Sequence, residues 1–285
     1  IICNLILGPT TASALVADAA PYSDVPTTHT FAGYIAYCQK EGIISGYADG
    51  TFRPAASLTG YAFMKMLLGA LGYDAEVEQY TGANWSINVA KRALNIGLDD
   101  DLVGDFNGVK AVTREEACLY ALNTLTADMV EYDAKTTVST NGTTVVIAGS
   151  KAKEMVNNGN TDGKIFGKDG VMQFAEKYFD NLSVKTGSDE FERPANVWKL
   201  KAEEIGTYTN TPDATYTKKV ENGDIYKDLN LGSPVAAKDV TVYVNGVEAT
   251  AAEIDIKKGS DVAIGKAVNT NGNGVLTEVF YDDDA

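Results

Sequence analysis

A helix pattern that occurs twice constrains the fold of this chain most strongly. Thr59 and Thr113 lie 54 residues apart, and each precedes a set of apolar residues spaced i, i+3, i+4, i+7. This spacing places the set on one face of an α-helix, and such a face is normally buried. The two sets are Met64, Leu67, Leu68 and Leu71, followed by Cys118, Ala121, Leu122 and Leu125.

A further helix pattern precedes each of these two helices and ends at a glycine, the residue most common just past a helix end. The distance from glycine to threonine is 17 residues in the first half (Gly42) and 16 in the second (Gly97). We therefore predict two repeats, at about residues 21–74 and 80–128, that stack on one core because one helical hairpin cannot bury its apolar face alone. The preceding helices have the stripes Phe31, Tyr34, Ile35 and Cys38, and Ser86, Val89, Ala90 and Ala93.

The loop of the first repeat has a sequence that defines its shape. It reads Gly46-Tyr47-Ala48-Asp49-Gly50-Thr51-Phe52-Arg53-Pro54. The glycines permit backbone angles closed to other residues, the aspartate can accept hydrogen bonds from amides downstream, and the proline prevents a helix.

The helix start of the second repeat contains an unexpected cation. Thr113-Arg114-Glu115-Glu116 has the form of a capping box, and its two glutamates suit the positive end of a helix. Arg114 is disfavoured there, so a local anion is expected. That anion is either a neighbouring carboxylate in a solvated pair or a bound ligand carboxylate held by the guanidinium and free helix amides.

The loop and the helix start resemble the S-layer homology family, whose repeats anchor bacterial surface proteins to the cell wall. Thr113-Arg114-Glu115-Glu116 is similar to the family's Thr-Arg-Ala-Glu signature. The resemblance implies that the arginine holds the acidic pyruvyl ketal of a secondary cell-wall polysaccharide and that the loop helps to wall the sugar pocket between adjacent repeats. The glycan-binding residues expected on this basis are Arg114, Thr113, Glu116, Tyr47, Asp49, Gly50, Thr51 and Phe52.

The sequence also departs from the family pattern. Gly60 stands where the first repeat should have its arginine, and the second repeat has the acidic segment 99–108 in place of the shaped loop. At best one composite site, with Arg114, is intact. Family members commonly carry three repeats and we find two, so a third comes from another subunit or the pair is a structural brace. Trp85 is a further candidate for stacking on a sugar, although core packing is commoner for tryptophan.

Composition limits the partners and the location. The chain has 285 residues with 24 basic and 39 acidic side chains, a net charge of −15, which repels nucleic acid and anionic lipid. It has no apolar run long enough for a membrane span. Residues 1–20 read as the remnant of a signal peptide, with an apolar start, Gly8-Pro9, and small residues at 12–14 or 17–19. The alternative is a short buried helix of an exported chain.

Metal and cysteine chemistry is not indicated. Cys38 and Cys118 fall on apolar stripes, so we expect free buried thiols, and no Cys or His set has metal-ligand spacing. The acidic runs 99–101 and 282–284 could attract Ca²⁺ only weakly. We therefore expect no cofactor.

Beyond about residue 130 the pattern changes from helix to strand. Asn141-Gly142 lies between two β-branched segments and predicts a hairpin over 136–147, and one helix is expected at about 171–182. Further strands are expected at 198–201, 239–246 and 275–281. The overall prediction is an α+β multidomain chain, with all-α repeats, an α+β spacer at 129–235 and a β-rich Ig-like module at 236–285. This last module is either complete or truncated.

These features predict a non-enzymatic protein of the cell surface that is exported and anchored non-covalently to wall polysaccharide. His29 is the only histidine and no catalytic set surrounds it. The β-rich remainder would be spacer or would self-associate in a lattice. Two alternatives are open: the anchoring part of a larger cell-wall or polysaccharide hydrolase, and a pure lattice-assembly protein without glycan binding.

Overall fold

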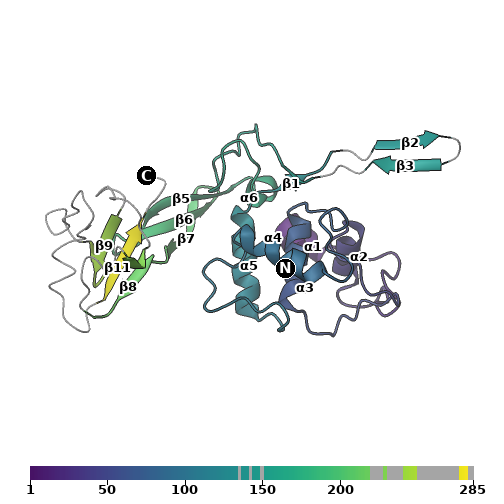
Figure 1. Cartoon of the computed structure of the whole chain (residues 1–285), viewed down its shortest axis with the longest axis horizontal. Coiled ribbons are helices and arrows are strands. Elements are labelled where there is room, and N and C mark those ends of the chain that lie inside the picture. The colour runs from purple at the N-terminus through teal and green to yellow at the C-terminus, as the bar shows by residue number, and fades with distance from the viewer. Residues whose placement is uncertain are drawn as a thin grey trace. The chain divides into compact units, whose positions relative to one another are not determined.

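The computed structural model describes residues 1–133, 136–140, 143–147, 151–218, 227–229, 240–248 and 276–281. They form helices and several antiparallel sheets, which agrees with the predicted α+β mixture (Figure 1). The chain divides into two compact units, residues 1–182 and 183–285, a coarser division than the four segments inferred from sequence. No helix in the described ranges combines the length and the apolar character needed to cross a bilayer.

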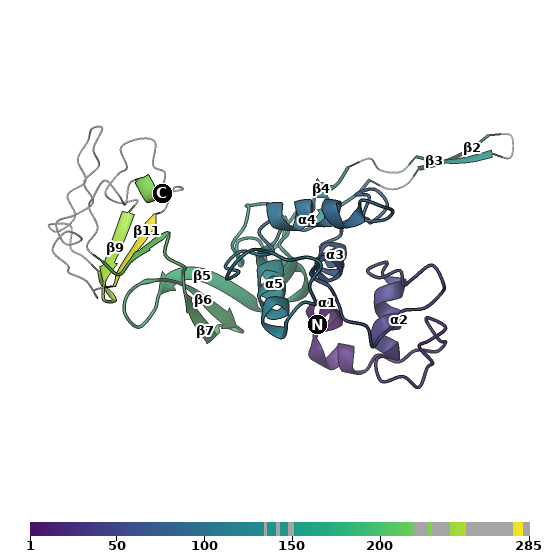
Figure 2. The ribbon, with the colours of Figure 1, turned by 60° about the horizontal axis from the view of Figure 1, so that its bottom comes forward.

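The first unit is built around helix α3, which contacts α1, α4 and α5 (Figure 2). The predicted stripe of α3, Met64, Leu67, Leu68 and Leu71, is buried with 0% exposure at every position. Thr59 caps the helix by accepting a hydrogen bond from the Ala62 amide at 3.3 Å. The helices of this unit are α1 (Ile2–Ser13), α2 (Ala32–Lys40), α3 (Gly60–Ala70), α4 (Trp85–Asn95), α5 (Arg114–Thr126) and α6 (Phe174–Tyr178).

The buried face of α5 differs from the predicted one. Cys118 and Leu122 are exposed, so the expectation that Cys118 is a buried thiol was wrong. The ring of Tyr120 packs edge-on against Phe106, with centroids 6.1 Å apart, and turns the helix by one residue relative to the predicted stripe. The residues that α5 buries are Ala117, Tyr120, Ala121 and Thr124.

The two preceding helices follow their predicted patterns more closely. Ile35 and Cys38 of α2 are buried, as are Val89 and Ala93 of α4. Phe31 is the exception, because it lies before the first turn of α2 and is 58% exposed. The helix positions therefore agree with the sequence analysis, and the idea that the halves are repeats of one unit stays a prediction.

Residues 2–13 form helix α1, which breaks at Gly8 (φ 73°, ψ 160°) just before Pro9. Ile2 and Cys3 are buried, and the Cys3 sulfur lies 3.5 Å from the sulfur of Cys38, both as free thiols. This geometry corresponds to the alternative of a short buried helix. Removal of the segment as a signal peptide stays a prediction.

Short strands follow α5. Strands β1 (Val130–Glu131) and β4 (Lys153–Glu154) pair antiparallel, as do β2 (Thr136–Thr140) and β3 (Thr143–Ile147). Thr140 faces Thr143, so two residues join β2 to β3, as the Asn141-Gly142 signal predicts. The hairpin is confirmed, and the turn residues themselves lie outside the described residues.

Helix α6 is shorter than predicted, with five residues in place of about twelve. Val171 forms a β-bridge with Val156, and the Met172 amide donates to the Met155 carbonyl at 2.7 Å, so this backbone is committed to strand pairing. Phe179, with φ −135° and ψ 65°, ends the helix. Strand contacts distant in sequence thus override the local helix pattern.

A buried carboxylate organises the segment around α6. Glu176 is 2% exposed. Its Oε2 accepts from Asn157 Nδ2 at 2.7 Å and from the Gln173 amide at 3.4 Å. Its Oε1 accepts from the amides of Lys164 at 3.2 Å and Ile165 at 3.4 Å. All four partners are donors, so both oxygens must be acceptors.

The second unit contains two sheets. One has three strands in the order β5-β6-β7, and the other has four in the order β10-β9-β11-β8. The strands expected at 198–201, 239–246 and 275–281 fall in β6, β9 and β11, whereas β5, β7, β8 and β10 were not predicted. The Ig-like assignment stays a prediction. The bounds are β5 (Leu182–Ser188), β6 (Pro194–Leu200), β7 (Glu203–Thr209), β8 (Ala214–Tyr216), β9 (Val240–Val244), β10 (Val247–Glu248) and β11 (Thr277–Tyr281).

Glu176→Gln is expected to destabilise the first unit by about 2 kcal/mol, because the amide group would place N–H donors against a buried donor. Urea unfolding should show a lower midpoint than wild type. Glu131→Gln, at an exposed position, is the matched control and should leave the midpoint unchanged. Equal midpoints for both variants would contradict the role assigned to Glu176.

Candidate glycan-binding site

The loop over residues 46–54 has the shape that its sequence predicts. Gly46 and Gly50 have φ of 66° and 78°. The Tyr47 amide donates to the Thr51 carbonyl at 2.8 Å, and the Gly50 amide donates to the Tyr47 carbonyl at 3.0 Å. Asp49 accepts from the Thr51 amide at 3.0 Å and from its hydroxyl at 2.6 Å. The loop is therefore closed by its own hydrogen bonds.

The charges of this loop are balanced internally. The Arg53 guanidinium lies 2.8 Å from Asp49 Oδ2 and 4.0 Å from the centroid of the Tyr47 ring. The Thr51 hydroxyl, and then Arg53, lower the pKa of Asp49 to about 2. Tyr47 remains 48% exposed, so the loop presents an aromatic ring held in place by a cation.

Residues 22–24 attach the loop to the rest of the repeat. The carboxylate of Asp24 accepts from the amides of Phe52 at 2.8 Å and Arg53 at 2.7 Å, and the Phe52 amide lowers the pKa of Asp24. Phe52 stacks on Tyr22 with centroids 5.4 Å apart. A Cβ at Gly46 would lie 2.3 Å from a Tyr22 ring atom, so this position requires glycine.

The predicted site therefore omitted three residues that shape the loop: Tyr22, Asp24 and Arg53. Two signals in the sequence could have identified the last two. Arg53 lies four residues after Asp49 in the same string, and Asp24-Val25 lies just upstream of the first helix pattern, whereas no local signal marks Tyr22.

The start of α5 forms the predicted capping box. The Thr113 hydroxyl accepts from the Glu116 amide at 3.1 Å, and the Glu116 carboxylate accepts from the Thr113 amide at 2.6 Å. The Thr113 amide is the main cause of the lowered pKa of Glu116. Lys110 Nζ lies 3.8 Å from Glu116 Oε1, so this carboxylate already has a cation and a backbone amide as partners.

Arg114 is exposed at the first position of α5. Within the described ranges it makes no ion pair, so the solvated pair with a neighbouring carboxylate is not formed there. The amides of Arg114 and Glu115 also have no acceptor among the described residues. This helix end therefore presents one guanidinium and two backbone donors.

In the first repeat, backbone carbonyls of residues 108 and 110 occupy the corresponding helix start. The Gly60 amide donates to the Lys110 carbonyl at 3.0 Å, and the Tyr61 amide donates to Gly108 at 2.9 Å. A Cβ at Gly60 would lie 3.1 Å from Gly108 Cα and 3.2 Å from the Asn107 carbonyl oxygen. The missing arginine at position 60 thus coincides with a close backbone approach.

Trp85 belongs to an aromatic cluster. It lies edge-on to Tyr61 with centroids 6.3 Å apart, and Lys65 Nζ is 5.6 Å from its ring centroid. Burial lowers the pKa of Lys65. Trp85 is only half-buried, so a role in stacking on a sugar stays a prediction.

The predicted site residues form two separate networks. Tyr47, Asp49, Gly50, Thr51 and Phe52 belong to the loop network with residues 22–24, whereas Thr113, Arg114 and Glu116 belong to the start of α5. Among the described residues, no hydrogen bond, ion pair or ring contact joins the two networks. The composite site stays a prediction.

Weak attraction of Ca²⁺ by the acidic run 99–101 stays a prediction. Burial raises the pKa of Asp99 and Asp100, which lie in the acidic segment of the second repeat. In the part of the chain that the structure describes, no group of three or more His, Cys, Asp or Glu side chains could hold a metal.

Comparison with known proteins gives one family match and several distant relatives. A family model described as the S-layer homology domain matches residues 21–60. The surface layer protein of Brevibacillus choshinensis is 24% identical over 80% of this chain and 23% of its own length. The S-layer protein of Bacillus licheniformis is 25% identical over 78% of this chain and 28% of its own.

An enzyme is also among the relatives. The endoglucanase of Bacillus sp. (strain KSM-635) is 26% identical over 61% of this chain and 20% of its own length. No solved structure shows a significant match. The chain thus spans between a fifth and three tenths of the length of these relatives.

The matched segment contains α2, the shaped loop with its Asp24 anchor, and the cap of α3. Residues 21–60 are therefore an S-layer homology domain, carried by a chain that is similar to bacterial surface-layer proteins.

Proposed function

We propose that residues 21–128 anchor an exported surface protein non-covalently to an acidic polysaccharide of the cell wall. Arg114 binds a carboxylate of the glycan, which the resemblance suggests is a pyruvyl ketal. The two halves act as the repeats of one anchoring module, and residues 129–285 serve as spacer or lattice material without catalytic activity.

A difference among the four arginines carries this proposal. Arg53, Arg92 and Arg193 lie 2.8–3.3 Å from the carboxylates of Asp49, Glu78 and Asp189. Arg114 has no such partner among the described residues. The chain has 39 acidic side chains, so an exposed arginine without a carboxylate partner among the described residues is available for an external anion.

The geometry at Arg114 suits a carboxylate. A guanidinium can donate two parallel hydrogen bonds to the two oxygens of a carboxylate. The amides of Arg114 and Glu115 add donors at the positive end of the α5 dipole. Tyr47, held by Arg53, supplies an exposed ring on the first-repeat loop for contact with a sugar.

The similarity to an endoglucanase favours a second candidate function. This chain corresponds to 20% of that relative, which is the size expected of an anchoring part within a larger enzyme. The complete reading frame distinguishes the two, because a cell-wall or polysaccharide hydrolase would contain a catalytic domain outside these 285 residues. A pure assembly protein would instead form ordered arrays without glycan.

Arg114→Gln is expected to weaken co-sedimentation with purified wall sacculi by about tenfold to a hundredfold, because hydrogen bonds to a charged group contribute about 1.5–3 kcal/mol. Arg114→Lys should give an intermediate loss, since it keeps the charge and loses the planar fork. Lys40→Gln, which removes an exposed charge from α2, is the control. If wild type and Arg114→Gln co-sediment equally while both remain folded, the proposed role of Arg114 is wrong.

The loop should lose its shape in acid. The folded-state pKa of Asp49 is about 2 and that of Asp24 is also lowered, so their stabilising bonds are complete above the unfolded pKa of about 4 and are lost as the pH falls toward the folded values. NMR titration of the Thr51 amide is expected to show a midpoint near 2.

Asp49→Asn provides the control for this titration. The Thr51 transition should disappear, whereas the amides of Phe52 and Arg53 should still respond to Asp24. A Thr51 midpoint near 4 in wild type would argue against the hydrogen bonds described for Asp49.

A further inference from the structure

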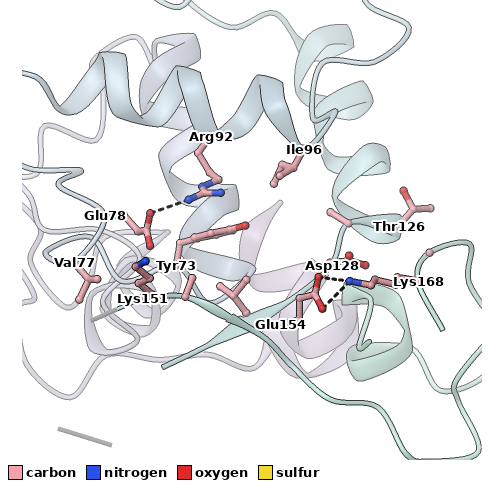
Figure 3. Close-up of a pocket in the computed structure, with 14 residues that line it drawn as sticks. Tyr73, Val77, Glu78, Arg92, Ile96, Thr126, Asp128, Lys151, Glu154 and Lys168 are labelled. Carbon is pink, nitrogen blue, oxygen red and sulfur yellow. Dashed lines mark hydrogen bonds and ion pairs between the residues drawn. The ribbon is translucent and has the colours of Figure 1, made fainter. Parts of the chain in front are cut away.

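A cavity of about 800 Å³ lies beside α4 in the first unit, and neither Arg114 nor the shaped loop lines it (Figure 3). Its wall comes from the segment between α3 and α4, from α4 itself, from the end of α5 and from the strands and loop that follow. Small-molecule sites commonly have volumes of about 300–1,000 Å³. The cavity is therefore large enough for a sugar of one or two rings.

Arg92 is fixed in the wall of this cavity. Its guanidinium lies 3.3 Å from Glu78 Oε2 and 5.2 Å from the centroid of the Tyr73 ring. A dashed line in Figure 3 marks the pair with Glu78. The Tyr132 hydroxyl donates to the other oxygen of Glu78 at 2.8 Å, which holds the carboxylate in turn. A guanidinium has five N–H donors, so donors remain for a ligand while its orientation is already set.

The charged groups around the cavity are balanced, unlike those of the whole chain. Three cations, Arg92, Lys151 and Lys168, face three carboxylates, Glu78, Asp128 and Glu154. Lys168 Nζ lies 2.8 Å and 3.0 Å from the two oxygens of Glu154, and Asp128 accepts from Gln173 Nε2 at 2.8 Å. Each carboxylate thus has a donor, whereas Lys151 makes no ion pair with a described residue.

A second cavity of about 410 Å³ shares Val77, Glu78 and Arg92 with the first. Its wall includes Tyr80, whose hydroxyl is buried and has no hydrogen-bond partner among the described residues. Burial of a hydroxyl without a hydrogen-bond partner costs free energy. This hydroxyl is therefore a buried polar group close to Arg92 that the cavity does not expose.

These features restrict the class of ligand. A phosphate dianion would meet three carboxylates, and a cation would compete with three ammonium or guanidinium groups. An apolar ligand would leave the polar wall unsatisfied. A sugar with one carboxylate fits best, because its hydroxyls can both donate and accept and its single charge can pair with Arg92 or Lys151.

We propose that this cavity binds a carboxylate-bearing sugar, with Arg92 and Lys168 as binding residues. It is a second saccharide site on the first unit, and it does not depend on the role proposed for Arg114. Arg92 pairs with the sugar carboxylate, while Lys168 and the carboxylates near it contact ring hydroxyls.

The test compares two sugars that differ by a lactyl carboxylate. N-acetylmuramic acid and N-acetylglucosamine are titrated into the full chain, with binding followed by calorimetry and by amide shifts in NMR. N-acetylmuramic acid is expected to bind at least tenfold more tightly and to shift amides of α4. Arg92→Gln and Lys168→Gln should each weaken its binding by fivefold or more, whereas Lys40→Gln, which removes an exposed charge from α2, should leave it unchanged.

Lys168→Gln keeps the test decisive if Arg92→Gln disturbs the fold by leaving Glu78 unpaired, because Lys168 is exposed. Equal affinity for the two sugars, no binding of N-acetylmuramic acid at millimolar concentration, or binding that survives both variants would overturn the proposal. Wall co-sedimentation of these variants and of Arg114→Gln separates the two sites. Loss of co-sedimentation only in Arg114→Gln concerns the proposed anchor, and loss of N-acetylmuramic acid binding in Arg92→Gln and Lys168→Gln concerns this cavity.

Discussion

The burial of one helix face underlies the first unit. Met64, Leu67 and Leu68 of α3 and Leu71 at its C-cap are wholly buried, and each large apolar side chain contributes about 1.5–3 kcal/mol when it leaves water. Helices α1, α4 and α5 all contact α3, so their positions are set by the same face. Since the S-layer homology match ends at the start of α3, this helix joins the matched domain to the segment that carries Arg114.

Local signals predicted helices α2 to α5 and the loop of this unit well. Apolar spacing located α2 to α5, and the string from Gly46 to Pro54 predicted a closed loop with an aspartate that bonds its own amides. The capping box of α5 and the register of the β2–β3 hairpin also followed from short motifs. In each case the interacting residues lie within a few positions of one another, so the sequence contains the whole interaction.

Contacts between distant residues account for what the sequence did not predict. The buried face of α5 depends on Tyr120 meeting Phe106, and the length of α6 depends on Val171 pairing with Val156. Strand β7, with two glutamates and a glycine, lacks the alternation of a half-buried strand and is held by pairing with β6. The role of Asp24 required knowledge that residues 22–24 lie against residues 52–53. The cavity beside α4 combines segments up to 95 residues apart, from Tyr73 to Lys168.

The backbone crossing at Gly60 and Gly108 limits the side chains that these two positions can carry. A Cβ at position 108 would lie 2.2 Å from the Tyr61 ring, and one at position 60 would meet the opposing backbone. An arginine at position 60 would therefore require the backbone of residues 107–108 to shift by a few tenths of an ångström. A second anion site at the start of α3 therefore depends on movement of residues 107–108 as well as on the substitution itself.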